Sequence, residues 1–170
     1  MNSTKYLTDA ERIGLETYLR ERIETDTRNA AMLLVALHSG ARASELLDLT
    51  WADLNLETGT TLISTLKGGL PREVVLPRFV VRALVQLKVQ SPSKPFDLSY
   101  NRLGEIWREY RPAPKPFHSL RHTFAMRAYD KTKDIRFVQR ALGHKSITNT
   151  MVYADHAYSA KEFKKLMRVR

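Results

Sequence analysis

The pattern of apolar and polar positions predicts a helix near the start of the chain. Thr8 and Glu11 have the spacing of a capping box, in which each side chain bonds the backbone N–H of the other residue. The apolar side chains that follow at helical spacing are Ile13, Leu15 and Leu19. Because such side chains share one side of a helix, we expect them to face the core from a helix over about residues 9–24.

A second helix is expected over about residues 28–38, where the central residues are apolar on every face. A helix without a polar face is buried, so this one is predicted to lie at the centre of the core. Gly40 suits its end, because glycine readily adopts the left-handed conformation that closes many helices. A short helix over residues 43–49 follows, with its leucines turned inward and with Arg42 and Glu45 flanking it.

Between residues 60 and 76 the pattern changes to two short β-prone segments, 60–64 and 73–76. A stretch that contains Lys67, two glycines and Pro71 separates them. Short β-prone runs joined by glycine are typical of a β-hairpin.

The rest of the chain is helical in pattern. Pro77 suits the start of a helix over about residues 78–89, whose expected buried side chains are Val80, Val81, Leu84, Val85 and Leu87. Further helices are expected over about residues 99–110, 118–130, 134–142, 146–153 and 158–168. The predicted fold is mainly α with a small antiparallel β-sheet (α+β), in a single domain over residues 1–170 with a C-terminal tail of about 157–170.

The charge is distributed unevenly. The formal net charge is +10, from 28 Lys and Arg against 18 Asp and Glu. Residues 1–110 hold 14 basic and 14 acidic side chains, whereas residues 111–170 hold 14 basic and 4 acidic ones. A concentrated positive field attracts polyanions, and side chains that neutralise DNA phosphates release counterions. Nucleic acid is the leading partner. The charge by itself also fits a basic surface that serves only solubility, or a contact with the ribosome or with anionic lipid.

Composition excludes several kinds of chemistry. The chain has no cysteine, which rules out disulfides, thiolate metal sites and a cysteine nucleophile. No apolar run approaches the roughly 18–20 residues that a membrane-spanning helix needs, and residues 1–5 lack the apolar core of a signal peptide. We therefore expect no membrane partner and a cytoplasmic, nucleoid-associated protein.

His118, Arg121 and His122 are the first candidates for chemistry. Their spacing puts them on one side of the helix expected over residues 118–130, where they can approach the same small anion. Taken singly, each of these side chains is explained equally well as a solvated surface residue. Tyr153, taken singly, is explained equally well as a core aromatic residue with its hydroxyl at the surface.

The combination is more specific than its parts. The ordered segments are Gly-Ala-Arg-Ala-Ser-Glu-Leu around Arg42, Lys67 on the hairpin, His118-Ser119-Leu120-Arg121-His122-Thr123, Leu142-Gly143-His144-Lys145-Ser146, and Tyr153. In this order the chain resembles the catalytic domain of the tyrosine recombinase (phage integrase) family over about residues 8–156. The steps of 23 residues from Arg121 to His144 and of 9 residues to Tyr153 belong to the resemblance.

The resemblance implies an enzyme of a phage or mobile element that cleaves and rejoins DNA strands at specific sites. Tyr153 would be the nucleophile and would form a 3′-phosphotyrosyl bond, which keeps the energy of the phosphodiester, so that no ATP is needed. Arg42 and Arg121 would pair with the nonbridging phosphate oxygens, since guanidinium forks bind them bidentately. Neither a metal nor a cofactor is implied.

Other roles follow from the same resemblance. Lys67 would protonate the leaving 5′ oxygen, and His118 and His144 would position protons or hydrogen-bond the phosphate and the tyrosine. Glu45 would support the basic cluster by pairing with it, and His122 would lie behind the phosphate, either as packing or as a support for the groups that contact it. Side chains expected to hold the DNA backbone are Lys115, Arg127, Lys131, Lys133, Arg136, Arg140 and Lys145.

Partners and alternatives remain open at this point. Double-stranded DNA is the expected partner, with a monomer in its absence and tetramers on paired DNA sites. The N-terminal core-binding domain of most family members is missing, so the chain is either an excised catalytic domain or a minimal recombinase of the fimbrial-switch type. The tail would pack on its own domain or on a neighbouring protomer.

Two alternative functions remain open, a type IB topoisomerase-like enzyme and a non-catalytic DNA-binding regulator. A metal-dependent nuclease fits least, because no Asp and Glu cluster resembles a two-metal site.

Overall fold

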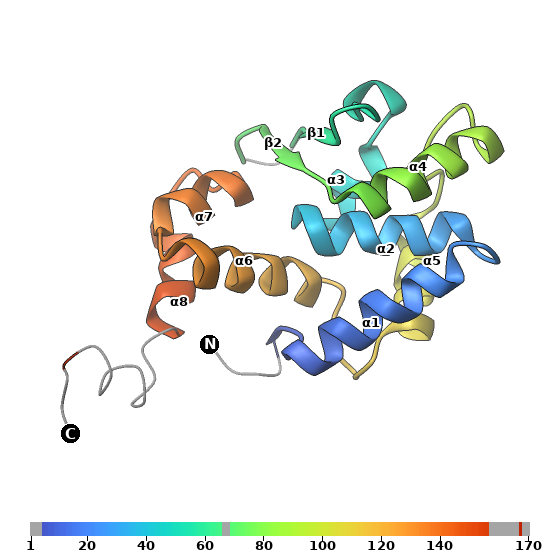
Figure 1. Cartoon of the computed structure of the whole chain (residues 1–170). Helices are drawn as coiled ribbons and strands as arrows, with labels where there is room; N and C mark the ends of the chain where they lie inside the picture. The colour runs from blue at the N-terminus through green and yellow to red at the C-terminus, as the bar shows by residue number, and fades with distance from the viewer. Residues whose placement is uncertain (1–4, 66–68, 157–166, 168–170) are drawn as a thin grey trace.

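The computed structural model describes residues 5–65, 69–156 and 167 (Figure 1). Its elements in chain order are α1 (Asp9–Arg22), α2 (Thr27–Ser39), α3 (Ala43–Asp48), the 3₁₀-helix η2 (Trp51–Asp53), β1 (Thr60–Ile63), β2 (Arg72–Val75), α4 (Arg78–Gln90), α5 (Tyr100–Tyr110), α6 (Ser119–Thr132), α7 (Ile135–Leu142) and α8 (Thr148–His156). The predicted mainly helical fold with a small antiparallel sheet is confirmed.

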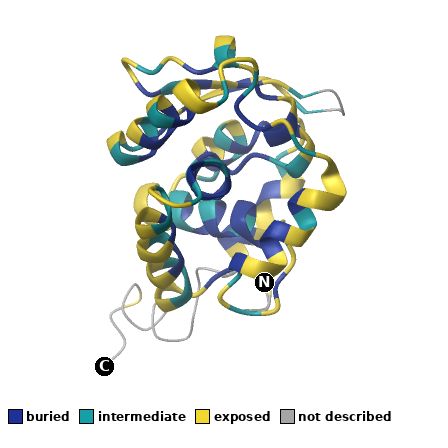
Figure 2. Ribbon diagram, turned by 90° about the vertical axis from the view of Figure 1, so that its right-hand side faces the viewer, coloured by how far each residue is buried: buried dark blue, intermediate teal, exposed yellow. Residues whose placement is uncertain are grey.

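Helix α2 lies at the centre of the fold, as its all-round apolar pattern predicted. It contacts α1, α3, α4 and α6, and Figure 1 shows these helices gathered around it. Every residue from Ala30 to Leu37 is completely buried, and Figure 2 shows the buried residues concentrated in the middle of the molecule. Burying one such leucine or valine contributes roughly 1.5–3 kcal/mol, so α2 dominates the first of two hydrophobic clusters.

The ends of the first two helices follow the predicted chemistry. The backbone N–H of Thr8 donates to Glu11 at 2.7 Å, and the N–H of Glu11 donates to the Thr8 hydroxyl at 3.3 Å, which completes the capping box. Gly40 closes α2 with φ +62°. The ring of Phe124 lies only 2.5 Å from where a Cβ on Gly40 would stand, so both the conformation and the space require glycine here.

The predicted hairpin consists of β1 paired antiparallel to β2, with Ile63 opposite Arg72 and Thr61 opposite Val74. Alternate side chains of a strand point to opposite faces, and on β2 the inward side chains are Arg72 and Val74. The hairpin also reaches the end of α7, because the N–H of Leu70 donates to the carbonyl of Gly143 at 3.0 Å. This bond brings the end of the loop before β2 next to the α7–α8 segment.

Helices α6, α7 and α8 enclose a second, smaller cluster. Its buried members are Ala125, Met126, Tyr129, Val138, Leu142, Tyr153 and Ala154. Helix α6 also contacts α2, so the two clusters adjoin along it. Tyr153 therefore belongs to a packed layer that fixes where its ring lies.

Some local predictions are wrong. Ile13 is 54% exposed and Val85 is 48% exposed, because each faces solvent from the outer side of its helix. The 3₁₀-helix Trp51–Asp53 was not predicted; its cap is Thr50, whose N–H donates to Asp53 at 2.9 Å. The helix expected over residues 158–168 lies outside the described residues, apart from residue 167.

Candidate active site

The turn between α2 and α3 positions Arg42 at a helix start. Gly40 ends α2 in the left-handed conformation, and Arg42 is the N-cap of α3. Glu45, at the third position of α3, accepts the backbone N–H of Arg42 at 2.8 Å and its Nη1 at 2.7 Å. The arginine side chain is 34% exposed, so it remains accessible to a ligand while Glu45 holds it in place.

Glu45 bonds more than one arginine. Nη2 of Arg72 lies 2.9 Å from its carboxylate, and Nη1 of Arg121 lies 3.8 Å from it. We call Arg42, Glu45, Arg72 and Arg121 the Glu45 cluster. Burial by itself raises the pKa of Glu45, but hydrogen bonds from Arg72 and from the backbone and side chain of Arg42 lower it to about 2. The carboxylate is therefore charged at neutral pH.

Arg121 is held rigidly by backbone carbonyls. Its side chain is 2% exposed; Nη1 donates to the carbonyl of Gly40 at 2.7 Å and Nη2 to that of Leu142 at 2.6 Å. These bonds join α6 to the ends of α2 and α7. Burial, followed by repulsion from Arg42 and Arg72, lowers the pKa of Arg121 to about 9, so the guanidinium still carries its charge at neutral pH.

The histidines predicted for the site stand around this cluster. His144 follows the helix-ending Gly143, and its Nδ1 lies 2.9 Å from the hydroxyl of the buried Thr150. Burial, together with Arg121 and Arg42, lowers the pKa of His144 to about 4. His118 is the exposed N-cap of α6, and the same causes lower its pKa. Both rings are neutral at pH 7.

Tyr153 on α8 lies against α6. It is 3% exposed, and its hydroxyl lies 2.9 Å from Nδ1 of His122. Burial raises the pKa of Tyr153, while the charges of Arg121 and Arg42 partly oppose the rise. The phenol is therefore protonated at neutral pH and stands within the field of the Glu45 cluster.

The cluster has the electrostatic character of an anion site. Arginine does not lose its proton in proteins under ordinary conditions, so three guanidinium groups and one carboxylate give a net charge of +2. Planar guanidinium groups match phosphate geometry, and a buried site strengthens such pairing because water screens it less. The arrangement can hold a phosphodiester beside a tyrosine hydroxyl.

The structure brings only some of the predicted site residues together. The structure brings Arg42, Glu45, Arg121, His144 and Tyr153 into one electrostatically coupled group, with His118 at its edge. Lys67 lies outside the described residues.

The structure contradicts the expectation that Lys115 contacts the DNA backbone. Its residue is 8% exposed, and its Nζ donates to the carbonyl of Tyr6 at 2.8 Å and to the carboxylate of Glu11 at 2.5 Å. The ammonium thus joins the start of α1 to the segment before α6, and it is not available to a phosphate.

The sequence did not assign Arg72 to the site, and it did not predict which group His122 contacts. The alternation along β2 offered a signal for Arg72, since it shares the inward face with Val74. His122 was expected behind the phosphate, as packing or as a support for other groups; its contact with Tyr153 depends on how α8 docks on α6, which no local pattern records.

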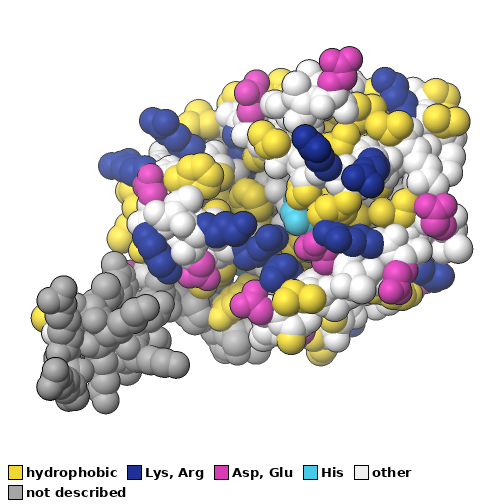
Figure 3. All heavy atoms as spheres, viewed as in Figure 1, with side chains coloured by type: hydrophobic (Ala, Val, Ile, Leu, Met, Phe, Trp, Pro, Cys, Tyr) yellow, Lys and Arg dark blue, Asp and Glu magenta, His cyan; other side chains and the backbone are white. Residues whose placement is uncertain are grey.

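The other expected DNA-backbone side chains lie at the surface or half-buried. They are Arg127, Lys131, Lys133, Arg136, Arg140 and Lys145. Arg127, Lys131 and Arg140 line a cavity of about 950 Å³ between β2, α6 and α7, which also borders Arg72 and His144. Figure 3 shows Lys and Arg side chains gathered on the face that carries α2, α6 and α7, with hydrophobic side chains between them. Their contact with DNA stays a prediction.

Metal-binding clusters and membrane-spanning helices are both absent from the described part of the chain. No group of three or more His, Cys, Asp or Glu side chains there could hold a metal ion. No helix among these residues is long and apolar enough to cross a membrane.

Comparison with known proteins identifies relatives. The sequence model of the phage integrase family matches residues 14–99 and 93–160. The tyrosine recombinase XerC of Mesorhizobium japonicum is 31% identical over 163 residues, covering 83% of this chain and 51% of the relative. The tyrosine recombinase XerA of Pyrococcus furiosus is 29% identical over 157 residues, covering 79% and 54%. The chain thus spans about half the length of the curated relatives it matches.

Solved structures share the fold. A crystal structure of XerA recombinase has a TM-score of 0.75 at 25% identity and covers 97% of this chain and 65% of that chain. The XerH site-specific recombinase, bound to its difH substrate in a pre-cleavage complex, has a TM-score of 0.74 at 24% identity and covers 97% and 54%. The arrangement of helices around the Glu45 cluster is therefore one that other proteins also adopt.

Proposed function

Because the chain belongs to the phage integrase family, we propose that it is the catalytic domain of a site-specific DNA recombinase. In this proposal Tyr153 attacks a backbone phosphate and forms a 3′-phosphotyrosyl bond, and the same steps in reverse rejoin the strands. The observation that carries the proposal is the Glu45 cluster, which sets the guanidinium groups of Arg42 and Arg121 within electrostatic reach of the Tyr153 hydroxyl.

The cluster supports this chemistry through charge placement. Attack on a phosphodiester puts additional negative charge on the nonbridging oxygens, and fixed cations stabilise that charge without reorganising. Arg42, half-exposed, would bind one oxygen directly. Arg121 is already bonded to two carbonyls, so its role is to supply charge and its remaining N–H groups. Arg72 would act through Glu45, by keeping the carboxylate paired while Arg42 turns to the phosphate.

The remaining residues would handle protons and position. Lys67 would donate the proton that the leaving 5′ oxygen needs, as the family resemblance implies. Neutral His144, fixed by Thr150 at 2.9 Å, would donate a hydrogen bond from its other nitrogen to a phosphate oxygen. His118, at the exposed start of α6, would contact the DNA backbone.

The proposed substrate is double-stranded DNA, held by the basic side chains of α6 and α7. The relatives' names support this choice, since the XerH structure contains a DNA substrate. We further propose that the protein forms tetramers on paired DNA sites, because two duplexes each cut on two strands need four tyrosines. Such a substrate places the protein in the cytoplasm, at the nucleoid.

The proposal is tested with a library of nicked suicide duplexes that carry a randomised arm. Cleavage next to the nick releases a short strand and traps the covalent protein–DNA complex, which is isolated in denaturant and sequenced. The wild-type chain should capture a defined subset of duplexes without metal or nucleotide. Tyr153→Phe should capture none while retaining binding in a gel-shift assay.

A matched control separates chemistry from folding. Tyr129 is buried in the same hydrophobic cluster as Tyr153, so Tyr129→Phe makes the same chemical change nearby and should still capture duplexes. Adduct formation by Tyr153→Phe would refute the proposal. Failure of the wild-type chain to form any adduct, with DNA binding intact, would support a non-catalytic regulator in its place.

A further inference from the structure

The hydroxyl of Tyr153 has one hydrogen-bond partner within the described part of the chain, Nδ1 of His122 at 2.9 Å. We propose that His122 holds this hydroxyl in place and takes its proton as the tyrosine oxygen attacks the phosphorus. This inference rests on the proposed function of Tyr153 as the nucleophile. It assigns the proton acceptor to the residue that follows Arg121, whereas the sequence placed His122 behind the phosphate, as packing or as a support for other groups.

Packing on both sides fixes the contact. Tyr153 lies in the hydrophobic cluster between α6 and α8, and its ring centroid is 5.9 Å from that of His122. On its other side, the His122 ring meets His118 edge to face, with centroids 4.7 Å apart and planes at 86°. The imidazole is thus held between a histidine and the tyrosine. Because the ring cannot turn freely, Nδ1 stays directed at the hydroxyl.

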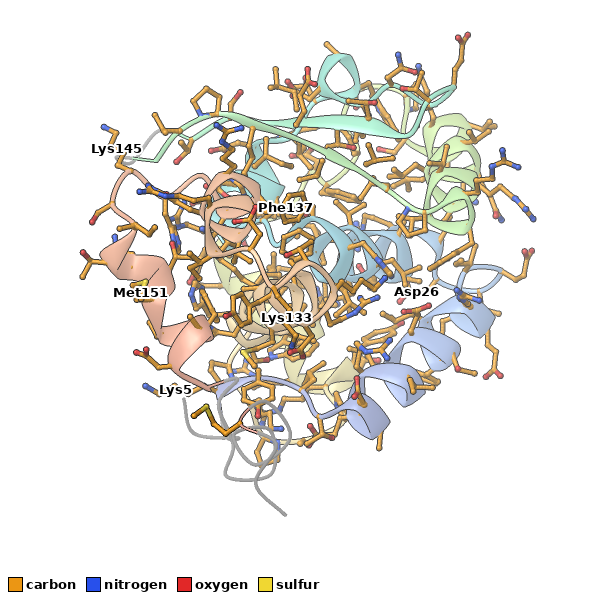
Figure 4. All side chains as sticks on the ribbon, turned by 60° about the vertical axis from the view of Figure 1, so that its left-hand side comes forward. Lys5, Asp26, Lys133, Phe137, Lys145 and Met151 are labelled. Carbon is orange, nitrogen blue, oxygen red and sulfur yellow. The ribbon has the colours of Figure 1, made fainter. Side chains whose placement is uncertain are left out.

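Charges around His122 decide which atom holds the proton before DNA binds. The groups whose charges act on it are His118 and Arg121 on α6 and Lys5 near the start of the chain; Figure 4 shows Lys5 beside α8. Burial first, then the neighbouring imidazole of His118, and then the positive charges of Arg121 and Lys5 lower the pKa of His122 to about 4. The ring is therefore neutral, and in the tautomer that the proposal requires, with hydrogen on Nε2, Nδ1 accepts the hydrogen bond that the Tyr153 hydroxyl donates.

A bound phosphodiester changes this balance. Its negative charge opposes the field of Arg121 and its neighbours, which favours the imidazolium and raises the pKa of His122. As the bond from Oη of Tyr153 to phosphorus forms, the phenolic proton moves to Nδ1 of His122. The bond from phosphorus to the 5′ oxygen breaks, and the proton that this oxygen needs comes from the general acid proposed above, Lys67. During rejoining, Nδ1 returns its proton to the tyrosine oxygen.

His118 is less suited to this step. It is the exposed N-cap of α6, and the described contacts of its ring are with His122 rather than with Tyr153. The direct contact to the attacking oxygen comes from the residue one turn further along the helix. A proton held on Nδ1 of His122 is also nearer to the tyrosine oxygen than a proton held on His118, and this oxygen needs a proton during rejoining.

The experiment measures single-turnover cleavage of a duplex selected from the library, across pH 5–9. His122→Asn puts an amide oxygen near the place of Nδ1, so that it can hold the hydroxyl but cannot take a proton. Because a general base contributes about 10²–10⁴ in rate, this variant should cleave at least about 100-fold more slowly at pH 7 with unchanged DNA binding. The wild-type rate should fall at acid pH as His122 becomes protonated, and the variant should lack this dependence.

The matched control is His38→Asn. His38 is also half-buried with its pKa lowered to about 4, but it pairs with Glu16, away from the tyrosine. This control should cleave at the wild-type rate and keep the wild-type pH profile. A wild-type rate and profile in His122→Asn would overturn the inference and leave the proposed function intact, since Tyr153→Phe tests that function separately.

A second measurement reads the tautomer and the pKa of His122 directly, in the free unaltered chain and in the DNA complex of Tyr153→Phe. Nitrogen NMR of ¹⁵N-histidine should show His122 in the free protein with hydrogen on Nε2 and an unprotonated Nδ1. Adding the selected duplex to Tyr153→Phe, which cannot cleave, should raise the pKa of His122. Hydrogen on Nδ1 in the free protein, or a pKa that DNA leaves unchanged, would contradict the inference.

Discussion

Arg72→Met tests whether the buried ion pair with Glu45 maintains the site. The substitution removes the guanidinium but keeps an apolar side chain of comparable length. Glu45 then retains Arg42 at 2.7 Å and Arg121 at 3.8 Å. Both side chains of the Arg72–Glu45 pair are 3% exposed, so water does not replace the lost bonds. Breaking a buried pair costs roughly 3–5 kcal/mol, and because Arg42 still bonds the carboxylate we expect a loss of about 2–3 kcal/mol.

The assay is a double-mutant cycle of Arg72→Met and Glu45→Gln, in which the free energy of unfolding of each variant is measured with urea at pH 7. The coupling between the two sites should reach about 2 kcal/mol, within the range of contacting buried groups. Arg102 and Glu105 provide the control, since they form an ion pair at 2.8 Å with side chains 53% and 49% exposed. That exposed pair should show no measurable coupling, because solvent screens it.

The pH dependence of stability supplies a second readout for the same pair. Burial opposes the change, but bonds from Arg72 and Arg42 lower the pKa of Glu45 from 4.5 to about 2, which corresponds to about 3 kcal/mol. Because the pKa is lower in the folded state, this stability is fully present above pH 4.5 and is lost as the pH falls toward 2. Arg72→Met should flatten the change between pH 5 and 3. A coupling below about 0.5 kcal/mol, or an unaltered pH dependence, would refute the reasoning.

Other positions respond in different ways. Gly143→Ala should lower stability by roughly 1–2 kcal/mol in urea unfolding, because alanine disfavours φ +64° and its Cβ would press on the carbonyl of Leu70; wild-type stability would contradict this. Lys115→Met should cost about 1–3 kcal/mol by breaking the partly buried pair with Glu11, whose side chain is 24% exposed, without changing the salt dependence of DNA binding. Lys131→Met should leave stability unchanged and should reduce the slope of log affinity for DNA against log salt concentration by about 0.9. Arg42→Lys should slow cleavage about 100-fold in single-turnover assays, since an ammonium cannot bond Glu45 and a phosphate as a fork does.

Local patterns determined much of the fold in advance. The apolar run of α2 predicted its central position, and Thr8 with Glu11 predicted where α1 begins. Gly40 predicted the end of α2, and it adopts positive φ, as does Gly143 at the end of α7. These features depend on spacing and backbone conformation within a few residues, which the sequence records directly.

Features that depend on docking could not be predicted in the same way. Lys115 looks like a surface cation in the sequence, yet its partner Glu11 lies 104 positions away. The bond between His122 and Tyr153 arises only where α8 packs on α6. Arg72 depends on both local pattern and docking. The alternation of side chains along β2 puts it on the inward face, but its partner Glu45 is on another element.

The most direct test of the central claim is to map the trapped DNA on the protein. The covalent complex with the selected duplex is digested with nuclease and protease, and the modified peptide is sequenced by mass spectrometry. We predict a nucleotide joined through its 3′ phosphate to Tyr153, with a 5′ hydroxyl on the released strand. A nucleotide on another side chain, or a link through a 5′ phosphate, would contradict the account.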